Sequence, residues 1–273
     1  MQKTRIALIG FGSVNKDVFR ALSEPDPELG ESLYDMKVFL RSRLMRRDPL
    51  PDGLTSVDSV QRLLDWRPDL IIEAASPQAV RDYVPLCLMA GRHVMIASVS
   101  AFADPFLYEQ IFRSAERGEG HISIPSGAVA GLDYLQALKG VDDVSVTYQS
   151  RKAVCAWSDE LRAQGLDPSS ITEPFMLFQG TAQQALERYS KRLNVAATLA
   201  LAGVGMQRTL VQVVIDPKVS GNEHHLKVSS PLGHMLFKLS NEPAPGGSGT
   251  SWVVAHSIVA AVKRRFNSRM AVV

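Results

Sequence analysis

The sequence is poor in cysteine, close to neutral, and free of long hydrophobic runs. It has only two cysteines in 273 residues, Cys87 and Cys155. Neither has the spacing of a metal site, so we expect two buried, reduced thiols in a cytoplasmic protein. The formal net charge is only +2, and no basic stripe is interleaved with aromatic residues. These features argue against a nucleic-acid partner.

Signals for membranes, export and metals are also missing. No apolar run is long enough to cross a bilayer, and Met1-Gln2 leads directly into a predicted strand. We therefore expect neither a signal peptide nor a membrane partner. No cluster of His, Cys and carboxylate residues has metal-ligand spacing, so we expect no metal. A hydrophobic content of 45% indicates a globular protein of one large domain or two modest ones.

The N-terminus carries a dinucleotide-binding fingerprint. The apolar run Lys3–Ile9 is followed by the glycine-containing segment Gly10–Asn15 and then by a helical pattern over 16–22. The motif requires this order of strand, tight turn and helix. An ordinary strand-to-helix turn with two glycines is the alternative.

Each residue of the turn has an expected role in holding the cofactor. Gly10 permits the turn, and Gly12 lets the backbone approach a pyrophosphate. The pyrophosphate would then lie on the amides that start the helix, at Ser13 and Val14. Asn15 replaces the third glycine, so we expect the helix and strand to pack slightly farther apart than usual.

The second predicted strand, Met36–Leu40, ends in Arg41-Ser42-Arg43. An NAD-selective enzyme usually has Asp or Glu there, for the ribose hydroxyls. Arg41 and Arg43 can instead pair with a 2′-phosphate. We therefore expect the cofactor to be NADP or NAD, with NADP accepted; a solvated basic loop is the alternative.

Strands and helices continue to alternate through the first half of the chain, which predicts a Rossmann-type, doubly wound parallel sheet over residues 1–125. Ligands bind at the carboxyl ends of such strands, so Ala75 and Ser98 are expected to line the cofactor cleft. For Ser76 and Ser98, helix capping is the alternative. Asp104 is placed to cap a helix over 105–117.

The pattern changes after residue 125. Small residues at 126–131 open a short helix, and strand-like runs then dominate. We expect a smaller α+β substrate and oligomerisation domain over 126–245, with helices on one face of its sheet. Residues 246–273 are expected to form a loop and a helix that returns to the first domain.

Four segments, in this order and behind this fingerprint, resemble the L-aspartate dehydrogenase family: Ser126-Gly127-Ala128, Asn194-Val195-Ala196-Ala197-Thr198, Asp216-Pro217 and Asn222-Glu223-His224. The resemblance covers nearly the whole chain. It implies NAD- or NADP-dependent oxidative deamination of L-aspartate to iminosuccinate, then oxaloacetate and ammonia, or the reverse. It also implies that the backbone at Ala128 and the side chain of Asn194 contact the cofactor and that His224 is catalytic. Asn15 and the loop 246–249, where relatives more often carry a proline-lysine pair, depart from the family pattern.

The chemistry of deamination gives His224 a specific role. Hydrolysis of the imine needs a water that has lost a proton, and an imidazole that titrates near neutrality can take and return it. Asn194, at a helix start, would hold the nicotinamide or its ribose. His225 should point to the opposite face of its strand. A histidine at a surface strand end is the alternative for His224.

Cations must face the two carboxylates of such a substrate. Arg151, Lys152 and Lys191 are candidates, and a solvated position is the alternative for each. Two other functions stay open: a related two-domain reductase of another amino or keto acid, and a non-catalytic dinucleotide sensor. Exposed apolar strands favour a homodimer.

Overall fold

The structure is a computed structural model that describes residues 3–27, 29–41, 49–245 and 249–267. The chain forms two compact units. The first contains the residues up to Gly127 and those from Ala255 onward, and the second contains Ala128–Val254.

The first unit is built on a parallel sheet with the strand order β3-β2-β1-β4-β5-β6. This order is that of the doubly wound dinucleotide-binding fold, which confirms the predicted fold class. The strands are β1 (Thr4–Ile9), β2 (Tyr34–Phe39), β3 (Thr55–Val57), β4 (Leu70–Glu73), β5 (His93–Ile96) and β6 (His121–Ser123). The α-helices are α1 (Ser13–Ser23), α2 (Val60–Asp65), α3 (Pro77–Met89), α4 (Pro105–Gly118) and, for the most part, α9 (Val253–Phe266).

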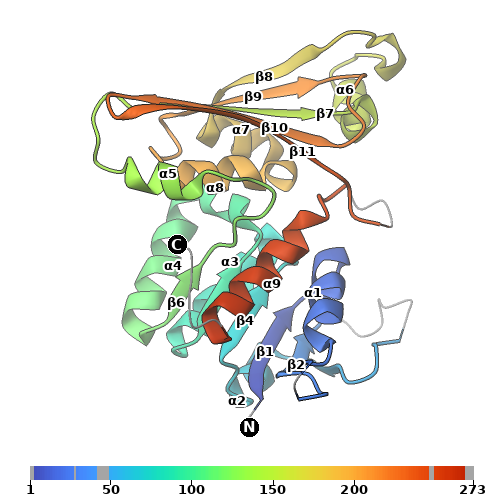
Figure 1. Cartoon of the computed structure of the whole chain (residues 1–273), viewed down its shortest axis with the longest axis vertical. Helices are drawn as coiled ribbons and strands as arrows, with labels where there is room; N and C mark the ends of the chain where they lie inside the picture. The colour runs from blue at the N-terminus through green and yellow to red at the C-terminus, as the bar shows by residue number, and fades with distance from the viewer. Residues whose placement is uncertain (1–2, 28, 42–48, 246–248, 268–273) are drawn as a thin grey trace. The chain divides into compact units, whose positions relative to one another are not determined.

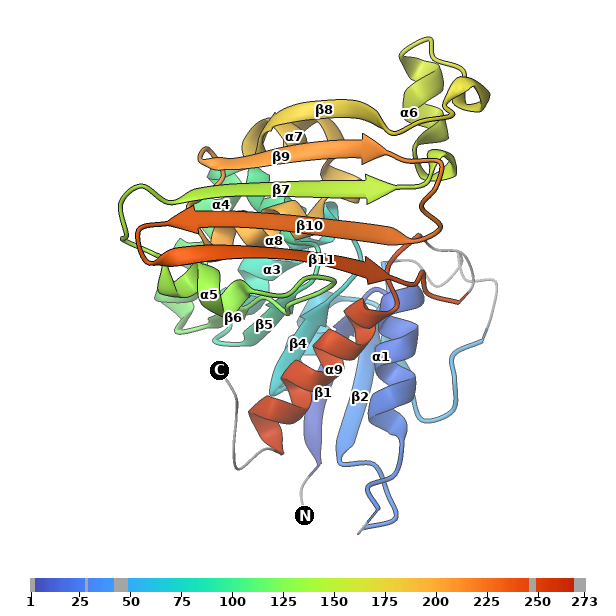
Figure 2. The same ribbon diagram turned by 45° about the horizontal axis from the view of Figure 1, so that its top comes forward.

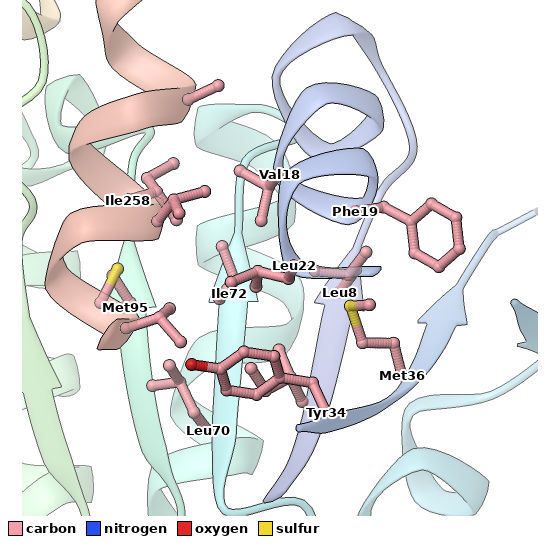
Figure 3. Packing of buried hydrophobic residues seen from close by; sticks show 14 of the residues in the cluster. Leu8, Val18, Phe19, Leu22, Tyr34, Met36, Leu70, Ile72, Met95 and Ile258 are labelled. Atoms are coloured by element: carbon pink, nitrogen blue, oxygen red, sulfur yellow. The ribbon is translucent and has the colours of Figure 1, made fainter. Parts of the chain in front are cut away.

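The C-terminal helix α9 completes the core of the first unit, as the sequence predicted. Ile258 of α9 packs in one cluster with Val18 of α1, Ile72 of β4 and Met95 of β5 (Figure 3). All four side chains are at most 3% exposed. Helix α4 begins as predicted, because the Asp104 carboxylate accepts hydrogen bonds from the first-turn amides.

The second unit is built on a mixed sheet with the strand order β11-β10-β7-β9-β8. The pair β7 and β9 is parallel, and the other neighbours are antiparallel. Its strands are β7 (Ser145–Lys152), β8 (Phe175–Thr181), β9 (Thr209–Ile215), β10 (Asn222–Ser230) and β11 (Gly233–Asn241). Its α-helices are α5 (Leu132–Ala137), α6 (Ser158–Ala163), α7 (Ala182–Tyr189) and α8 (Asn194–Ala202).

The two faces of this second sheet differ. Helices α5, α7 and α8 lie against one face, which we call the inner face (Figures 1 and 2). On β10 the alternate residues from Asn222 to Ser230 are buried there. The outer face carries a row of hydrogen-bonded amides, Gln149, Gln212 and Gln179. The expectation of a sheet packed by helices on one face is therefore confirmed.

The two cysteines do not share one environment. Both are free, and Cys87 is buried, so that desolvation raises the pKa of its thiol to about 12. Cys155 is exposed, and the prediction that it is buried is wrong. It lies in the short helical turn Val154–Trp157, in which the side chain of Trp157 is buried and that of Cys155 is not.

None of the helices in the described ranges has both the length and the hydropathy of a membrane-spanning segment. In the same part of the chain, no group of three or more His, Cys, Asp or Glu residues is arranged to hold a metal ion.

Candidate active site

The glycine turn of the first unit has the geometry of a pyrophosphate cradle. Gly10 has φ +80°, and a Cβ there would lie 2.6 Å from the Cβ of Ala75, so a side chain is excluded both by backbone strain and by contact. A Cβ on Gly12 would meet nothing within 4 Å. Gly12 also precedes α1 without a side chain to cap it. The amides that begin at Ser13 and Val14 therefore form a helix start suited to an anion.

Asn15 has a role that the sequence did not predict. It is fully buried, and its side-chain amide donates to the carbonyl oxygens of Ile9, at 3.1 Å, and Gly10, at 2.9 Å. These bonds tie the first turn of α1 to the end of β1. The substitution of the third glycine thus supplies a polar link between helix and strand.

Glu73, the last residue of β4, organises the carboxyl ends of two strands. Its carboxylate accepts hydrogen bonds from the amides of Ala75 (2.8 Å), Ser76 (3.0 Å) and Ser98 (3.1 Å), and from the Ser98 hydroxyl (2.9 Å). Burial raises the pKa of Glu73, against the effect of these four donors. The sequence signal for this role was a carboxylate inside an apolar run.

The two serines named from the sequence have different roles. Ser76 caps α3 by accepting from the amide of Ala79. Ser98 is buried, and its hydroxyl donates to the Glu73 carboxylate, so its side chain does not cap a helix. Ala75 is exposed beside Gly10.

The basic segment after β2 is described only at its first residue. Arg41 is exposed. Arg43 lies outside the described residues.

His224 occupies the inner face of the second sheet. It is 4% exposed, which overturns the alternative of a surface strand-end histidine. Its Nδ1 lies 2.7 Å from the hydroxyl oxygen of Tyr148, and the two rings stack with centroids 6.0 Å apart. In the described part of the chain, Nε2 is buried and has no hydrogen-bond partner. As predicted, His225 faces the other way, where it pairs with Glu223 at 3.1 Å.

Burial sets the charge state of His224. Desolvation, with smaller contributions from Lys152 and His225, lowers the pKa of His224 to about 4. The expectation of an imidazole titrating near neutrality is therefore wrong for the chain by itself. At neutral pH the ring is uncharged and keeps one nitrogen able to accept a proton.

The start of α8 lies near the same end of the sheet. Asn194 is the first residue of α8 and is exposed. Arg192, two residues earlier, interacts electrostatically with Lys152, and Lys152 in turn interacts with His224. Arg192 and Lys152 are thus neighbouring cations, and Lys152 lies near the neutral ring of His224.

The backbone of Ala128 is hydrogen-bonded to the end of β11, which lies beside the start of β10. Its carbonyl oxygen accepts from the side chain of Asn241, at 2.8 Å. Asn241 lies opposite Asn222 in the β10–β11 pairing, and the buried Asn222 amide donates to the Ser251 hydroxyl at 3.0 Å. Asn222 therefore holds the segment at Ser251, just before α9.

Tyr148, the hydrogen-bond partner of His224, is not among the residues expected from the sequence. The strand-like run over 144–148 contains it, and alternate residues of a strand share one face. Only the pairing of β7 with β10 shows that this position faces His224. The resulting group of a neutral imidazole, a phenol and an ammonium can exchange a proton and attract an anion.

Comparison with known proteins identifies the family. Residues 133–265 match the family model described as aspartate dehydrogenase, C-terminal, and residues 10–125 match the NAD binding domain of homoserine dehydrogenase. The chain is 46% identical to L-aspartate dehydrogenase 2 of Bordetella pertussis over 262 residues, which cover 95% of this chain and 96% of that protein. It is 33% identical to L-aspartate dehydrogenase of Methanosarcina barkeri over 267 residues, which cover 95% and 96% of the two chains.

Among solved structures, aspartate dehydrogenase from Thermotoga maritima has 26% identity and a TM-score of 0.75, with all of both chains covered. A hyperthermophilic archaeal homoserine dehydrogenase in complex with NADPH has 13% identity and a TM-score of 0.56, with 96% of this chain and 97% of that chain covered, and supports the fold alone. The agreement extends across both units and includes the segments that place Asn194 and His224. This chain therefore belongs to the L-aspartate dehydrogenase family.

Proposed function

We propose that this protein is an NAD(P)-dependent L-aspartate dehydrogenase, which oxidises L-aspartate to iminosuccinate, followed by hydrolysis to oxaloacetate and ammonia, in a reversible reaction. The observation that carries this proposal is the buried His224–Tyr148 pair in a chain similar to L-aspartate dehydrogenases over 95% of its length. The glycine turn at the start of α1 fits the pyrophosphate of the cofactor.

His224 acts as the acid/base. NAD(P)⁺, when bound, takes the hydride from the substrate Cα. In the tautomer with Nδ1–H donating to the Tyr148 oxygen, Nε2 of His224 is free to accept a proton from the water that attacks the imine carbon. In the amination direction the protonated ring returns that proton. Tyr148 is a positioning residue, because it fixes the ring through Nδ1.

A substrate panel tests the proposed function. Purified protein is supplied with NAD⁺ or NADP⁺ and individual amino acids, and formation of the reduced cofactor is followed by absorbance. We expect turnover with L-aspartate, and consumption of reduced cofactor with oxaloacetate plus ammonia. Turnover confined to another amino or keto acid would instead identify a related reductase. Cofactor binding without any turnover would identify a sensor.

Arg41 supports acceptance of NADP. It is exposed just after β2, where a guanidinium can pair with a 2′-phosphate. Arg41→Ala is expected to raise the KM for NADP⁺ about 10-fold relative to that for NAD⁺, as the loss of one charged hydrogen-bond partner implies. If steady-state kinetics show the same ratio of the two KM values, for NADP⁺ and NAD⁺, in the variant and the wild type, this role of Arg41 is contradicted. Arg81→Ala, at the exposed salt bridge with Asp104, is the control.

We also propose that the protein is a cytoplasmic homodimer. A second copy of the chain is proposed to cover the outer face of the second sheet, where Leu236 is 79% exposed. Sedimentation at several concentrations tests this homodimer, and a monomer throughout would refute it. A cytoplasmic location is supported by the two free thiols.

A further inference from the structure

The inner face of the second sheet carries a lysine next to the proposed acid/base. In the pairing of β7 with β10, Ser150 lies opposite His224, and Lys152 lies opposite Asn222. Side chains alternate along a strand, so Tyr148, Ser150 and Lys152 share the face of His224. The electrostatic interaction between Lys152 and His224 agrees with this placement.

Lys152 has an unusual electrostatic environment. Within the described ranges it has no carboxylate partner, and the charged group that acts on it most is another cation, Arg192. Arg192 is itself paired with Glu160 at 2.7 Å. Burial and Arg192 together lower the pKa of Lys152 to about 8. A partly buried ammonium without an anion is costly, so a position of this kind is suited to an anionic ligand.

The other two candidate cations are placed differently. Arg151 forms an ion pair with Asp216 and also donates to Gln149, in the row on the outer face. Lys191 is exposed. Of the three cations considered from the sequence, only Lys152 shares the face of His224.

We propose that Lys152 binds a carboxylate of the substrate and holds it beside His224. This assignment rests on the proposed function, which supplies a substrate with two carboxylates. An ammonium and a carboxylate form a charge-assisted hydrogen bond that is stronger than a neutral one. The negative charge brought to this face also favours the protonated imidazole, so binding moves the proton affinity of His224 toward the value that the acid/base role needs.

Substitution of Lys152 is expected to separate substrate binding from cofactor binding. Lys152→Met removes the charge and keeps an unbranched apolar stem. We expect the KM for L-aspartate to rise about 10- to 100-fold, the effect of losing one charged hydrogen-bond partner, with the KM for NAD(P)⁺ changed less than about 2-fold. Lys139→Met is the matched control, because Lys139 is exposed just after α5. Lys152→Gln is the second variant if the first does not fold.

Direct binding of succinate, a dicarboxylate without an amino group, gives a readout that does not depend on turnover. Calorimetry with and without NADP⁺ is expected to show binding to the wild type and to Lys139→Met, and binding at least about 10-fold weaker to Lys152→Met. In the wild type, succinate is also expected to slow labelling of Lys152 by an amine reagent, measured by mass spectrometry, and to leave the labelling of the exposed Lys139 unchanged. This last measurement needs no variant.

The outcomes separate this inference from the proposed function. An unchanged KM for L-aspartate in Lys152→Met, or labelling of Lys152 that succinate does not slow, overturns the role of Lys152 even if the wild type oxidises L-aspartate. Binding of succinate that depends on Lys152, in a protein that does not turn over L-aspartate, supports the carboxylate site and refutes the proposed reaction.

Discussion

A single imidazole carries the proposed proton transfer, and its neighbours decide what it can do. His224 is uncharged at neutral pH because burial opposes the imidazolium form. Tyr148 occupies one ring nitrogen and leaves the other available. Burial raises the pKa of Tyr148 itself, so its phenol stays protonated and serves only as a hydrogen-bonding group.

His224→Ala is expected to lower turnover of L-aspartate by about 10²- to 10⁴-fold, the usual contribution of a general acid/base. Cofactor affinity should be nearly unchanged, since the glycine turn belongs to the first unit. Steady-state kinetics and cofactor titration measure the two effects. His225→Ala, the next residue on the opposite face, is the control. Full activity in His224→Ala would remove the acid/base assignment.

Tyr148→Phe keeps the ring and removes the hydroxyl that fixes His224. We expect kcat to fall about 10-fold, in line with the loss of a buried hydrogen bond that orients the ring. The pKa of His224, followed by NMR of the ring protons, should fall further, because the imidazolium loses an acceptor. Tyr189→Phe is the control: Tyr189 is buried against Trp157, and its hydroxyl has no partner among the described residues. An unchanged kcat together with an unchanged His224 pKa would show that Tyr148 only packs.

At the scale of elements, a buried carboxylate holds together the carboxyl ends of two strands in the first unit. Glu73 joins the end of β4 to the residues after β5 through four hydrogen bonds. Parallel strands place their carboxyl ends at one edge of the sheet, where a cofactor binds. A buried carboxylate is therefore used to shape backbone that would otherwise lack partners.

Glu73→Ala is expected to lower the free energy of unfolding by about 3 kcal/mol, since several buried donors lose their acceptor. The KM for NAD(P)⁺ should rise several-fold, because Ala75 and Ser98 lose their positions. Denaturant unfolding and kinetics measure the two effects. Glu116→Ala, at an exposed position of α4, is the control. A stable variant with unchanged cofactor KM would show that Glu73 does not organise this edge.

At the scale of the whole molecule, His224 ties stability to pH. Its pKa is about 4 in the fold, against an ordinary value of 6.5. The unfolded chain therefore binds more protons between these values, and the stability that depends on the neutral ring is present above about pH 6.5 and is lost as the pH falls toward 4. The shift corresponds to a loss on the order of 3 kcal/mol.

Comparison of the wild type with His224→Gln isolates this contribution from other titrating groups. The stability of the wild type relative to the variant is expected to decline as the pH falls from 7 to 4, as measured by denaturant unfolding. His234 is exposed, so the free energy of unfolding of His234→Gln should change with pH in the same way as that of the wild type. If the difference between wild type and His224→Gln does not change with pH, the imidazole is not held neutral by the fold.

The sequence by itself determined the local features. Gly10 and Gly12 between an apolar run and a helical pattern predicted the turn between β1 and α1, and Asp104 predicted the start of α4, because turns and caps depend on residues close together along the chain. Periodicity likewise placed His224 and His225 on opposite faces of a strand. The family resemblance added the identity of the functional segments.

Only the tertiary structure decided which distant residues meet. The pairing of β7 with β10 brought Tyr148 and Lys152 beside His224, and the adjacency of β4 and β5 brought Ser98 to Glu73. Register and burial depend on the packing of elements far apart in the chain, so no local pattern could show them. For the same reason, the low pKa of His224 and the exposure of Cys155 became known only with the fold.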